Sequence, residues 1–419
     1  MTDIKKFKIQ TLGCKVNQYE SEKIKETLIS LGFEESKNEE ECLVYIINTC
    51  TVTNLADKKS RQKIRQAISG SPNAKIIVTG CGVQNLNSKI STIDGITILS
   101  DKDFFKEFVI DLFNLKNTEQ VILTGKNRAF LKIGDGCDRF CTYCIVPYVR
   151  GQVRSKPFDE VVQEAERLVK NGSKEIVLTS IHLGAYGKEL KNDTNLALLL
   201  DVLAENLKEV RIRLSSLEPL DFSPEILEIL KKHKNICRHI HLPLQHASNS
   251  ILQNMNRRYT KENFKEISRK IKTELPDCEL TTDIIVGFPG ETEADFEELT
   301  EFVKEMDFLK CHVFKYSKRT GTPAAEFQNQ IPEEIKHDRS KKLIEICNYI
   351  AETRYKSLLG KTVEILVEEN QNNFWTGFTG NYIRIYLKSD ENLQNKFVNV
   401  KVTEYTEEKL IGYLTAIRK

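Results

Sequence analysis

The feature that most constrains the fold is an alternation of apolar strands and helices at the start of the chain, with a cysteine after each of three strands. Residues 7–11, 43–47 and 75–78 are short apolar runs typical of strands, and residues 18–31 and 54–68 have the spacing of helices. Strand–helix–strand units of roughly thirty residues predict a parallel sheet of the flavodoxin-like kind.

The three cysteines of this region, Cys14, Cys50 and Cys81, each stand just past the carboxyl end of a predicted strand. Their separations of 36 and 31 residues match one crossover each. Open α/β sheets bind ligands at that edge, so we expect the three thiols to converge as ligands of an iron–sulfur cluster with one open iron. The alternative is three buried cysteines that pack as small apolar residues.

A second cysteine triplet, Cys137, Cys141 and Cys144, has the spacing C-x3-C-x2-C. Soft thiolates are the ligands of iron–sulfur clusters and of zinc, and a cluster usually takes four cysteines. Three ligands leave one position open, as in catalytic zinc sites. A zinc knuckle is the alternative, but no second C-x-x-C lies nearby to complete one.

The rest of the chain predicts two further folds. Six apolar strand candidates alternate with helices from about Val121 to Ser357 and favour a partial (β/α)6 barrel: residues 129–133, 175–178, 210–214, 239–244, 280–286 and 310–314. The last ~60 residues hold five short strand candidates separated by polar turns: residues 362–367, 375–378, 383–387, 398–405 and 409–416. This ending predicts a small antiparallel barrel. The expected domains are residues 1–118, 119–356 and 357–419.

Composition narrows the class of protein. A net charge of +2 does not by itself indicate a nucleic-acid binder. The eleven cysteines follow a start without the apolar segment of a signal peptide, and no run of about eighteen apolar residues predicts a membrane span. We therefore expect a cytoplasmic protein whose cysteines bind metal or pack in the core.

Long motifs in a fixed order make the chain resemble the methylthiotransferases, a branch of the radical S-adenosylmethionine (SAM) enzymes. The resemblance covers nearly the whole chain, including an ending similar to the TRAM RNA-binding barrel. Its motifs are residues 11–21 around Cys14, GCDRFCTYCIVPYVRG (136–151), HLPLQHAS (241–248), MNRRYT (255–260) and DIIVGFPGET (283–292). Gly13-Cys14-Lys15-Val16-Asn17-Gln18 is similar to the branch that modifies N6-threonylcarbamoyladenosine in tRNA.

Two segments depart from that branch. Residues 245–248, Gln-His-Ala-Ser, stand where Gln-Ser-Gly-Ser is frequent, and the histidine is similar to the branch that modifies a ribosomal-protein aspartate. Residues 319–323, Arg-Thr-Gly-Thr-Pro, have threonine where proline is common.

The resemblance implies the reaction and its cofactors. Sulfur would be inserted at C-2 of adenosine 37, and SAM would methylate that sulfur. The cofactors would be two 4Fe–4S clusters and SAM, one cluster on Cys14, Cys50 and Cys81 and the other on Cys137, Cys141 and Cys144. The implied SAM contacts are Tyr143, Ser180, Ser216, Glu218, Gln245 and Asp283, although the polar ones are equally explained as caps or turn residues. No catalytic acid or base is assigned.

The implied partners are the tRNA anticodon loop, a sulfur donor and an electron donor such as flavodoxin or ferredoxin. Candidate RNA contacts are the basic residues of the helix after Cys50 and the aromatic and basic residues of the last barrel: Lys58, Lys59, Arg61, Lys63, Arg65, Trp375, Phe378, Tyr382, Arg384 and Tyr386. A solvated helix face and a barrel core explain the same residues. The alternative functions are the same chemistry on isopentenyladenosine or on a ribosomal-protein side chain, and a non-enzymatic iron–sulfur module that binds RNA.

Overall fold

The computed structural model describes residues 5–39, 41–85, 88–102, 104–116, 127–190, 193–406 and 408–418. The chain divides into two compact units that interleave along the sequence. The first unit holds residues 1–124, 135–152 and 317–326, and the second holds residues 125–134, 153–316 and 327–419. The expected domain boundary at 118–119 falls outside the described residues, and the three-domain division stays a prediction.

The first unit is built on a parallel sheet with the strand order β2-β1-β3-β4-β5. This is the flavodoxin-like order, which confirms the predicted fold. The strands are β1 (Lys5–Thr11), β2 (Phe33–Glu35), β3 (Val44–Thr49), β4 (Lys75–Gly80) and β5 (Thr97–Ile98). The helices are α1 (Lys15–Ser30), α2 (Asn54–Gly70), α3 (Cys81–Gln84), α4 (Phe105–Phe113) and α5 (Val146–Arg150).

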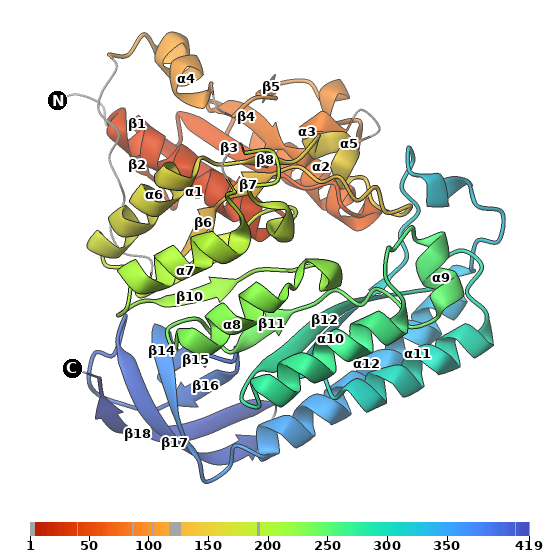
Figure 1. The fold of residues 1–419 in the computed structure, drawn as a ribbon. Coiled ribbons are helices and arrows are strands. Elements are labelled where there is room, and N and C mark those ends of the chain that lie inside the picture. Colours follow the sequence, from red (N-terminus) through yellow and green to blue (C-terminus); the bar gives the residue numbers. More distant parts are fainter. Residues whose placement is uncertain are drawn as a thin grey trace. The chain divides into compact units, whose positions relative to one another are not determined.

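Both faces of this sheet are covered, as Figure 1 shows for the helices around β1, β3 and β4. The middle strand β3 is buried along its whole length. Ile46 belongs to one apolar cluster and its neighbour Ile47 to another, because successive side chains of a strand point to opposite faces.

Two segments distant in sequence complete the first unit. The backbone N–H of Ala324 donates to the carbonyl of Thr142 over 2.9 Å, joining residues 317–326 to the loop of the second cysteine triplet. The guanidinium of Arg319 pairs with the carboxylate of Asp57 at 2.7 Å, joining the same segment to α2.

The second unit contains six parallel strands in two sheets, β6-β9-β10 and β11-β12-β13. Isolated bridges join Ile212 to Ile236 and Ser216 to His241, so the six strands form the predicted partial barrel. The strands are β6 (Arg128–Lys132), β9 (Glu175–Thr179), β10 (Arg211–Leu214), β11 (His239–His241), β12 (Glu279–Val286) and β13 (Lys310–Lys315), with the short β7 (Gly134–Asp135) and β8 (Arg154–Ser155) between the first two.

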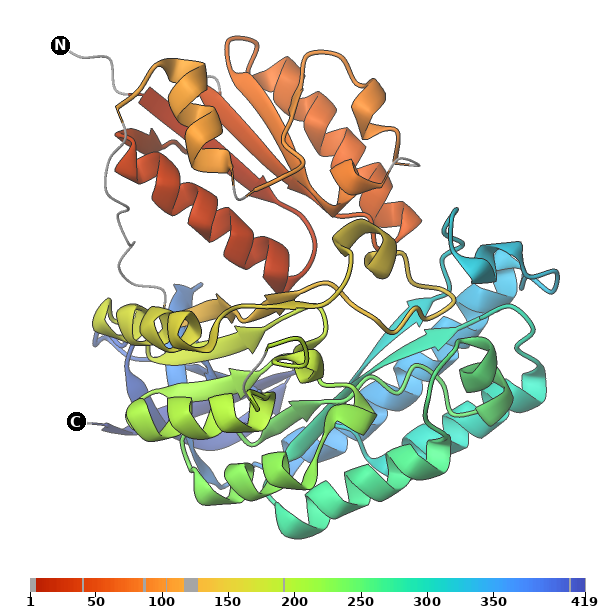
Figure 2. The ribbon, with the colours of Figure 1, turned by 45° about the horizontal axis from the view of Figure 1, so that its top comes forward.

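In the part of the chain that the structure describes, seven α-helices accompany these strands, and Figure 2 shows helices in yellow-green to blue packed along the sheets. They are α6 (Phe158–Lys170), α7 (Leu196–Asn206), α8 (Pro224–Lys232), α9 (Asn249–Asn254), α10 (Lys261–Glu274), α11 (Glu293–Met306) and α12 (Glu333–Lys356). The largest apolar core lies between strands and helices, with Leu178, Ile212 and Leu280 facing residues such as Leu199 and Phe296. None of the described helices is long and apolar enough to cross a membrane.

The chain ends in a closed five-stranded barrel with the order β14-β15-β16-β18-β17. Its strands are β14 (Thr362–Gln371), β15 (Phe374–Thr379), β16 (Arg384–Leu387), β17 (Phe397–Thr406) and β18 (Lys409–Ile417). The small barrel was predicted, but its closing pair, β16 with β18, is parallel and not antiparallel. Closure leaves no open sheet edge.

This small barrel is joined to the six-stranded array by buried charged groups. Arg213 of β10 is 1% exposed, pairs with Glu175 of β9 at 2.7 Å and donates to the carbonyl of Gly380 at 3.1 Å. The neighbouring Arg211 donates to the carbonyl of Phe378 at 2.9 Å. The small barrel therefore belongs to the second unit and is not a loosely tethered module.

Candidate metal centres

The first three cysteines meet at the carboxyl edge of the first unit's sheet. Cys14 precedes α1, Cys50 directly follows β3, and Cys81 is the first residue of α3. Their strands β1, β3 and β4 are adjacent, and the terminal residues Thr49 and Gly80 are register partners. Burial raises the pKa of Cys50 to about 11, and the nearby thiols of Cys81 and Cys14 add to this rise. The three thiols thus lie within electrostatic reach of one another.

Two of these cysteines follow a glycine with positive φ. Gly13 has φ +102°, and a Cβ placed on it would lie 2.9 Å from the Cβ of Cys50. Gly80 has φ +97°, and its Cβ would lie 2.4 Å from the carbonyl oxygen of Thr49. Only glycine accepts this conformation and this approach of the neighbouring strand, so the backbone turns sharply and places the next residue at the edge.

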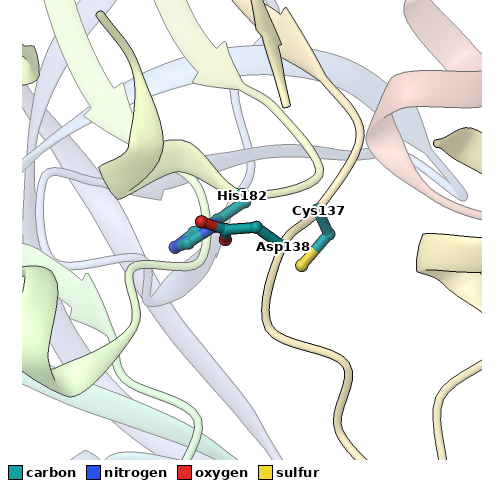
Figure 3. A group of neighbouring side chains, drawn as sticks. All are labelled: Cys137, Asp138 and His182. Atoms are coloured by element: carbon teal, nitrogen blue, oxygen red, sulfur yellow. The ribbon is translucent and has the colours of Figure 1, made fainter. Parts of the chain in front are cut away.

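The second triplet lies on a loop of the first unit between β7 and α5. Cys141 is buried, whereas Cys137 and Cys144 are half-buried. The N–H of Cys137 donates to the carbonyl of Gly151 at 3.1 Å, and that of Cys144 donates to the carbonyl of Cys141 at 2.9 Å. Figure 3 shows Cys137 and Asp138 as successive side chains of this loop.

The donor set and spacing of both triplets suit clusters better than single ions. In the part of the chain that the structure describes, the sets of three ligand atoms within 4.8 Å of one another contain at most one cysteine each. A single ion needs its ligands that close, whereas a cubane holds its thiolates at separate corners. Three soft thiolates per site, without a fourth at hand, fit a cluster with one open iron.

Arg150 is the residue of this region that the sequence reasoning missed. It ends α5, and its Nε donates to the Sγ of Cys81 at 3.0 Å. Burial raises the pKa of the Cys81 thiol, and the charges of Arg150 and Lys102 oppose that rise. The pairing of Arg150 with Cys81 is a tertiary contact, which no local pattern could have indicated.

The residues implied as SAM contacts lie in two places. Tyr143 stands between Cys141 and Cys144 in the first unit, and the others belong to the second unit. Ser180 directly follows β9, and Ser216 follows β10 by two residues. Glu218 already forms an ion pair with Arg257.

Gln245 and Asp283 are held together by their backbones. The N–H of Gln245 donates to the carbonyl of Asp283 at 2.8 Å, and Gln245 itself has a positive φ of +62°. Asp283 lies in the middle of β12, which ends at Val286 as the sequence predicted. Its carboxylate lies 3.4 Å from the Nε2 of His241.

Asp283 shares its surroundings with two histidines to which the sequence reasoning gave no role. His241 of β11 and His312 of β13 flank Asp283 of β12, with their ligand atoms all within 4.8 Å. Thr281 fixes the ring of His241 through a 2.9 Å contact between its Oγ1 and the Nδ1 of His241. The three side chains come from neighbouring strands and form a partly exposed polar group.

The unusual His246 of the Gln-His-Ala-Ser segment is a buried residue. It is 0% exposed, and its Nε2 lies 3.5 Å from a carboxylate oxygen of Glu291. Arg339 pairs with the other oxygen of Glu291 at 2.8 Å. The departure at His246 therefore concerns interior packing of the second unit.

The candidate RNA contacts separate into surface and interior groups. Lys58, Lys59 and Arg65 of α2 are exposed, whereas Arg61 donates to the carbonyl of Ser88 at 2.8 Å. In the small barrel, Phe378 and Tyr382 stack on each other at 4.9 Å, and Tyr382 also stacks on His239. These two rings therefore pack against other side chains of the second unit.

Comparison with known proteins places this arrangement in a class. The Radical SAM superfamily matches residues 131–303, and the uncharacterized protein family UPF0004 matches residues 6–99. The radical SAM methyltransferase TsrM from Kitasatospora setae aligns with a TM-score of 0.58 at 14% identity, over 77% of each chain. The cobalamin-dependent SAM radical enzyme OxsB aligns with a TM-score of 0.52 at 12% identity, over 82% of this chain and 56% of that one. The family match over residues 131–303, together with the fold, defines a radical SAM protein.

Sequence relatives narrow the class. The threonylcarbamoyladenosine tRNA methylthiotransferase MtaB of Bacillus subtilis (strain 168) is 41% identical over 94% of this chain and 92% of its own. The tRNA-2-methylthio-N(6)-dimethylallyladenosine synthase of Clostridium perfringens (strain SM101 / Type A) is 36% identical over 98% of both. The chain belongs to the radical SAM tRNA methylthiotransferases and is similar to MtaB. Its family works with a 4Fe–4S cluster and SAM.

Proposed function

We propose that the protein converts N6-threonylcarbamoyladenosine at position 37 of tRNA to its 2-methylthio derivative. The observation that supports this substrate is the 41% identity to the Bacillus subtilis relative named for threonylcarbamoyladenosine, against 36% for relatives named for dimethylallyladenosine. The Gly13–Gln18 signature supports the same choice. His246 does not oppose it, because its ring is buried against Glu291.

We further propose that the protein holds two 4Fe–4S clusters. Cys14, Cys50 and Cys81 would hold one, and Cys137, Cys141 and Cys144 the other. When bound, the clusters and SAM supply the radical, the sulfur and the methyl group. The protein's own part is to orient these groups: the sheet edge fixes the first triplet, and the loop before α5 fixes the second. A reduced flavodoxin or ferredoxin and a sulfur donor would complete the reaction.

Ser180, Ser216, Gln245, Asp283 and the ring of Tyr143 are the proposed SAM contacts. Glu218 is also a proposed contact, and its ion pair with Arg257 fixes its carboxylate.

For RNA we propose the exposed face of α2 and two aromatic–lysine pairs on the small barrel. Lys388 lies 5.1 Å from the ring of Phe374, and Lys409 lies 6.0 Å from the ring of Tyr386. Such pairs stack on bases and attract phosphates.

Mass spectrometry of tRNA nucleosides tests this function in cells with and without the gene. We expect the 2-methylthio derivative of threonylcarbamoyladenosine to disappear in the deletion strain while its unmodified precursor accumulates. Loss of the methylthio derivative of isopentenyladenosine instead would assign the rival substrate. An unchanged nucleoside profile would contradict both.

A further inference from the structure

Arg150 connects the segment of the second cysteine triplet to the first triplet by a dense set of hydrogen bonds. Its side chain is 8% exposed. Besides the 3.0 Å bond from Nε to the Sγ of Cys81, Nη2 donates to the Oδ1 of Asn17 at 2.7 Å. Nη1 donates to Glu20 at 2.5 Å and to Asp135 at 3.1 Å. Every nitrogen of the guanidinium therefore has a partner.

Apolar packing fixes the same contact. Ile145, directly before α5, and Val149, within α5, form a buried cluster with Cys81. The helix begins two residues after Cys144, so its position depends on the loop that carries the second triplet. Arg150 is thus held beside Cys81 by the packing of α5 as well as by its own hydrogen bonds.

Two carboxylates and the sulfur of Cys81 surround the guanidinium of Arg150. Lys102 forms an ion pair with Glu20, so the two cations Arg150 and Lys102 face the two carboxylates Glu20 and Asp135. The cysteine sulfur, a thiolate once it binds a metal, adds one further negative charge. Asn17 links the network to the other strand ends, since its Nδ2 donates to the carbonyl of Thr49 at 2.9 Å.

We propose that Arg150 is a positioning residue that raises the reduction potential of the cluster on Cys14, Cys50 and Cys81. This inference rests on the proposed two-cluster function. One-electron reduction adds a negative charge to the cluster, and a cation that donates a hydrogen bond to a ligand sulfur stabilises the reduced form. Because Arg150 belongs to the segment of the other triplet, the potential of one cluster depends on the folding of the loop that holds the other.

The test is a redox titration followed by electron paramagnetic resonance on the full chain loaded with both clusters. The variant with Cys137, Cys141 and Cys144 replaced by Ala identifies the signal of the cluster on Cys14, Cys50 and Cys81. Arg150→Gln should shift the midpoint potential to a more negative value. Arg150→Lys keeps the charge and should shift it less. Arg154→Gln, the same change at an exposed arginine four residues later, is the matched control and should leave the midpoint unchanged.

The outcomes separate this inference from the proposed function. A triple variant that binds no cluster contradicts the two-cluster proposal and this inference with it. A parent cluster whose midpoint is the same with Arg150→Gln overturns the inference alone. If Gln and Lys variants both lose the cluster while Arg154→Gln keeps it, Arg150 has only a structural role and the redox inference is wrong.

Discussion

Single residues set the backbone geometry at the ends of the strands. At the carboxyl edge of the first unit's sheet, Gly80 is the clearest example. It needs φ +97° and allows the backbone of Thr49 to approach within a distance that no Cβ permits. The sequence indicated that Gly13-Cys14 and Gly80-Cys81 end their strands, because an apolar run followed by glycine is a local signal. It did not indicate Arg150, whose partners lie up to 133 residues away.

Gly80→Ala should remove much of the cluster bound by Cys14, Cys50 and Cys81. The added methyl group meets the Thr49 backbone at 2.4 Å and Ala disfavours this φ, so Cys81 must move. Iron and sulfide analysis after anaerobic reconstitution measures the loss. Gly172→Ala is the matched control: Gly172 has φ +98° but no atom within 4 Å of the added carbon. Equal iron contents in the two variants would contradict the argument.

In the second unit, the clearest example at the residue scale is the buried ion pair of Glu175 in β9 and Arg213 in β10. Both side chains are 1% exposed, so removing one charge leaves the other buried without compensation. Glu175→Gln should cost about 3–5 kcal/mol of stability. A fall in Tm measured by calorimetry checks this. Glu205→Gln, in an exposed pair with Lys208, should change Tm little, and similar shifts for both variants would contradict the prediction.

The ion pair of Glu175 and Arg213 also makes the stability of the protein depend on pH. Burial acts to raise the pKa of Glu175, but the charge and hydrogen bonds of Arg213, together with the charges of Arg128 and Arg211, outweigh burial, so the pKa is lowered. A carboxyl with a lowered pKa contributes stability above its unfolded pKa, and this contribution is lost as the pH falls through its folded pKa. The Tm difference between the parent and Glu175→Gln should therefore shrink on acidification.

At the scale of elements, the apolar runs predicted the major strands and their order along the chain to within a few residues. They missed β2 and β5, which have three and two residues, because such short edge strands carry little periodic signal. The parallel pairing of β16 with β18 was also missed, since local patterns report a strand but not its partner. The interleaving of the two units depends on tertiary contacts such as Arg319 with Asp57 and could not be predicted locally.

The strongest prediction at the scale of elements concerns tRNA binding by the small barrel. Replacing Phe374 and Tyr386 with Ala together should weaken tRNA binding roughly tenfold or more, since base–aromatic stacking contributes about 1–3 kcal/mol per base. Filter binding at one fixed salt concentration measures the affinity. Tyr413→Ala, at an exposed ring of the same barrel, is the control. Unchanged affinity in the double variant would exclude this face. Point variants test this face better than deletion of the small barrel, because deletion would also remove the carbonyl partners of Arg211 and Arg213.

At the scale of the whole molecule, both cysteine triplets belong to the first unit, although more than fifty residues separate Cys81 from Cys137. The sequence predicted that each triplet holds its own cluster, but it could not predict that α5 would pack on α3. Because both triplets belong to one compact unit, the two proposed clusters would keep a fixed position relative to each other.

Replacing either triplet with Ala should leave about half of the iron, as expected for two independent clusters of equal size. Only the change at Cys137, Cys141 and Cys144 should abolish release of 5′-deoxyadenosine from SAM. Iron analysis and chromatography of the SAM products measure the two effects. Full iron in either variant would contradict the two-cluster assignment.

The central claim, the substrate, is tested most directly by turnover of two tRNAs with the purified, cluster-loaded protein, reductant, SAM and a sulfide source. A site that pairs the threonyl carboxylate and the carbamoyl group leaves buried polar groups unpaired when it meets an isoprenyl substituent, which disfavours that analogue by roughly 10⁴-fold. We predict conversion of threonylcarbamoyladenosine to its 2-methylthio derivative and essentially no conversion of isopentenyladenosine. Comparable turnover of both tRNAs, or of isopentenyladenosine alone, would contradict the account.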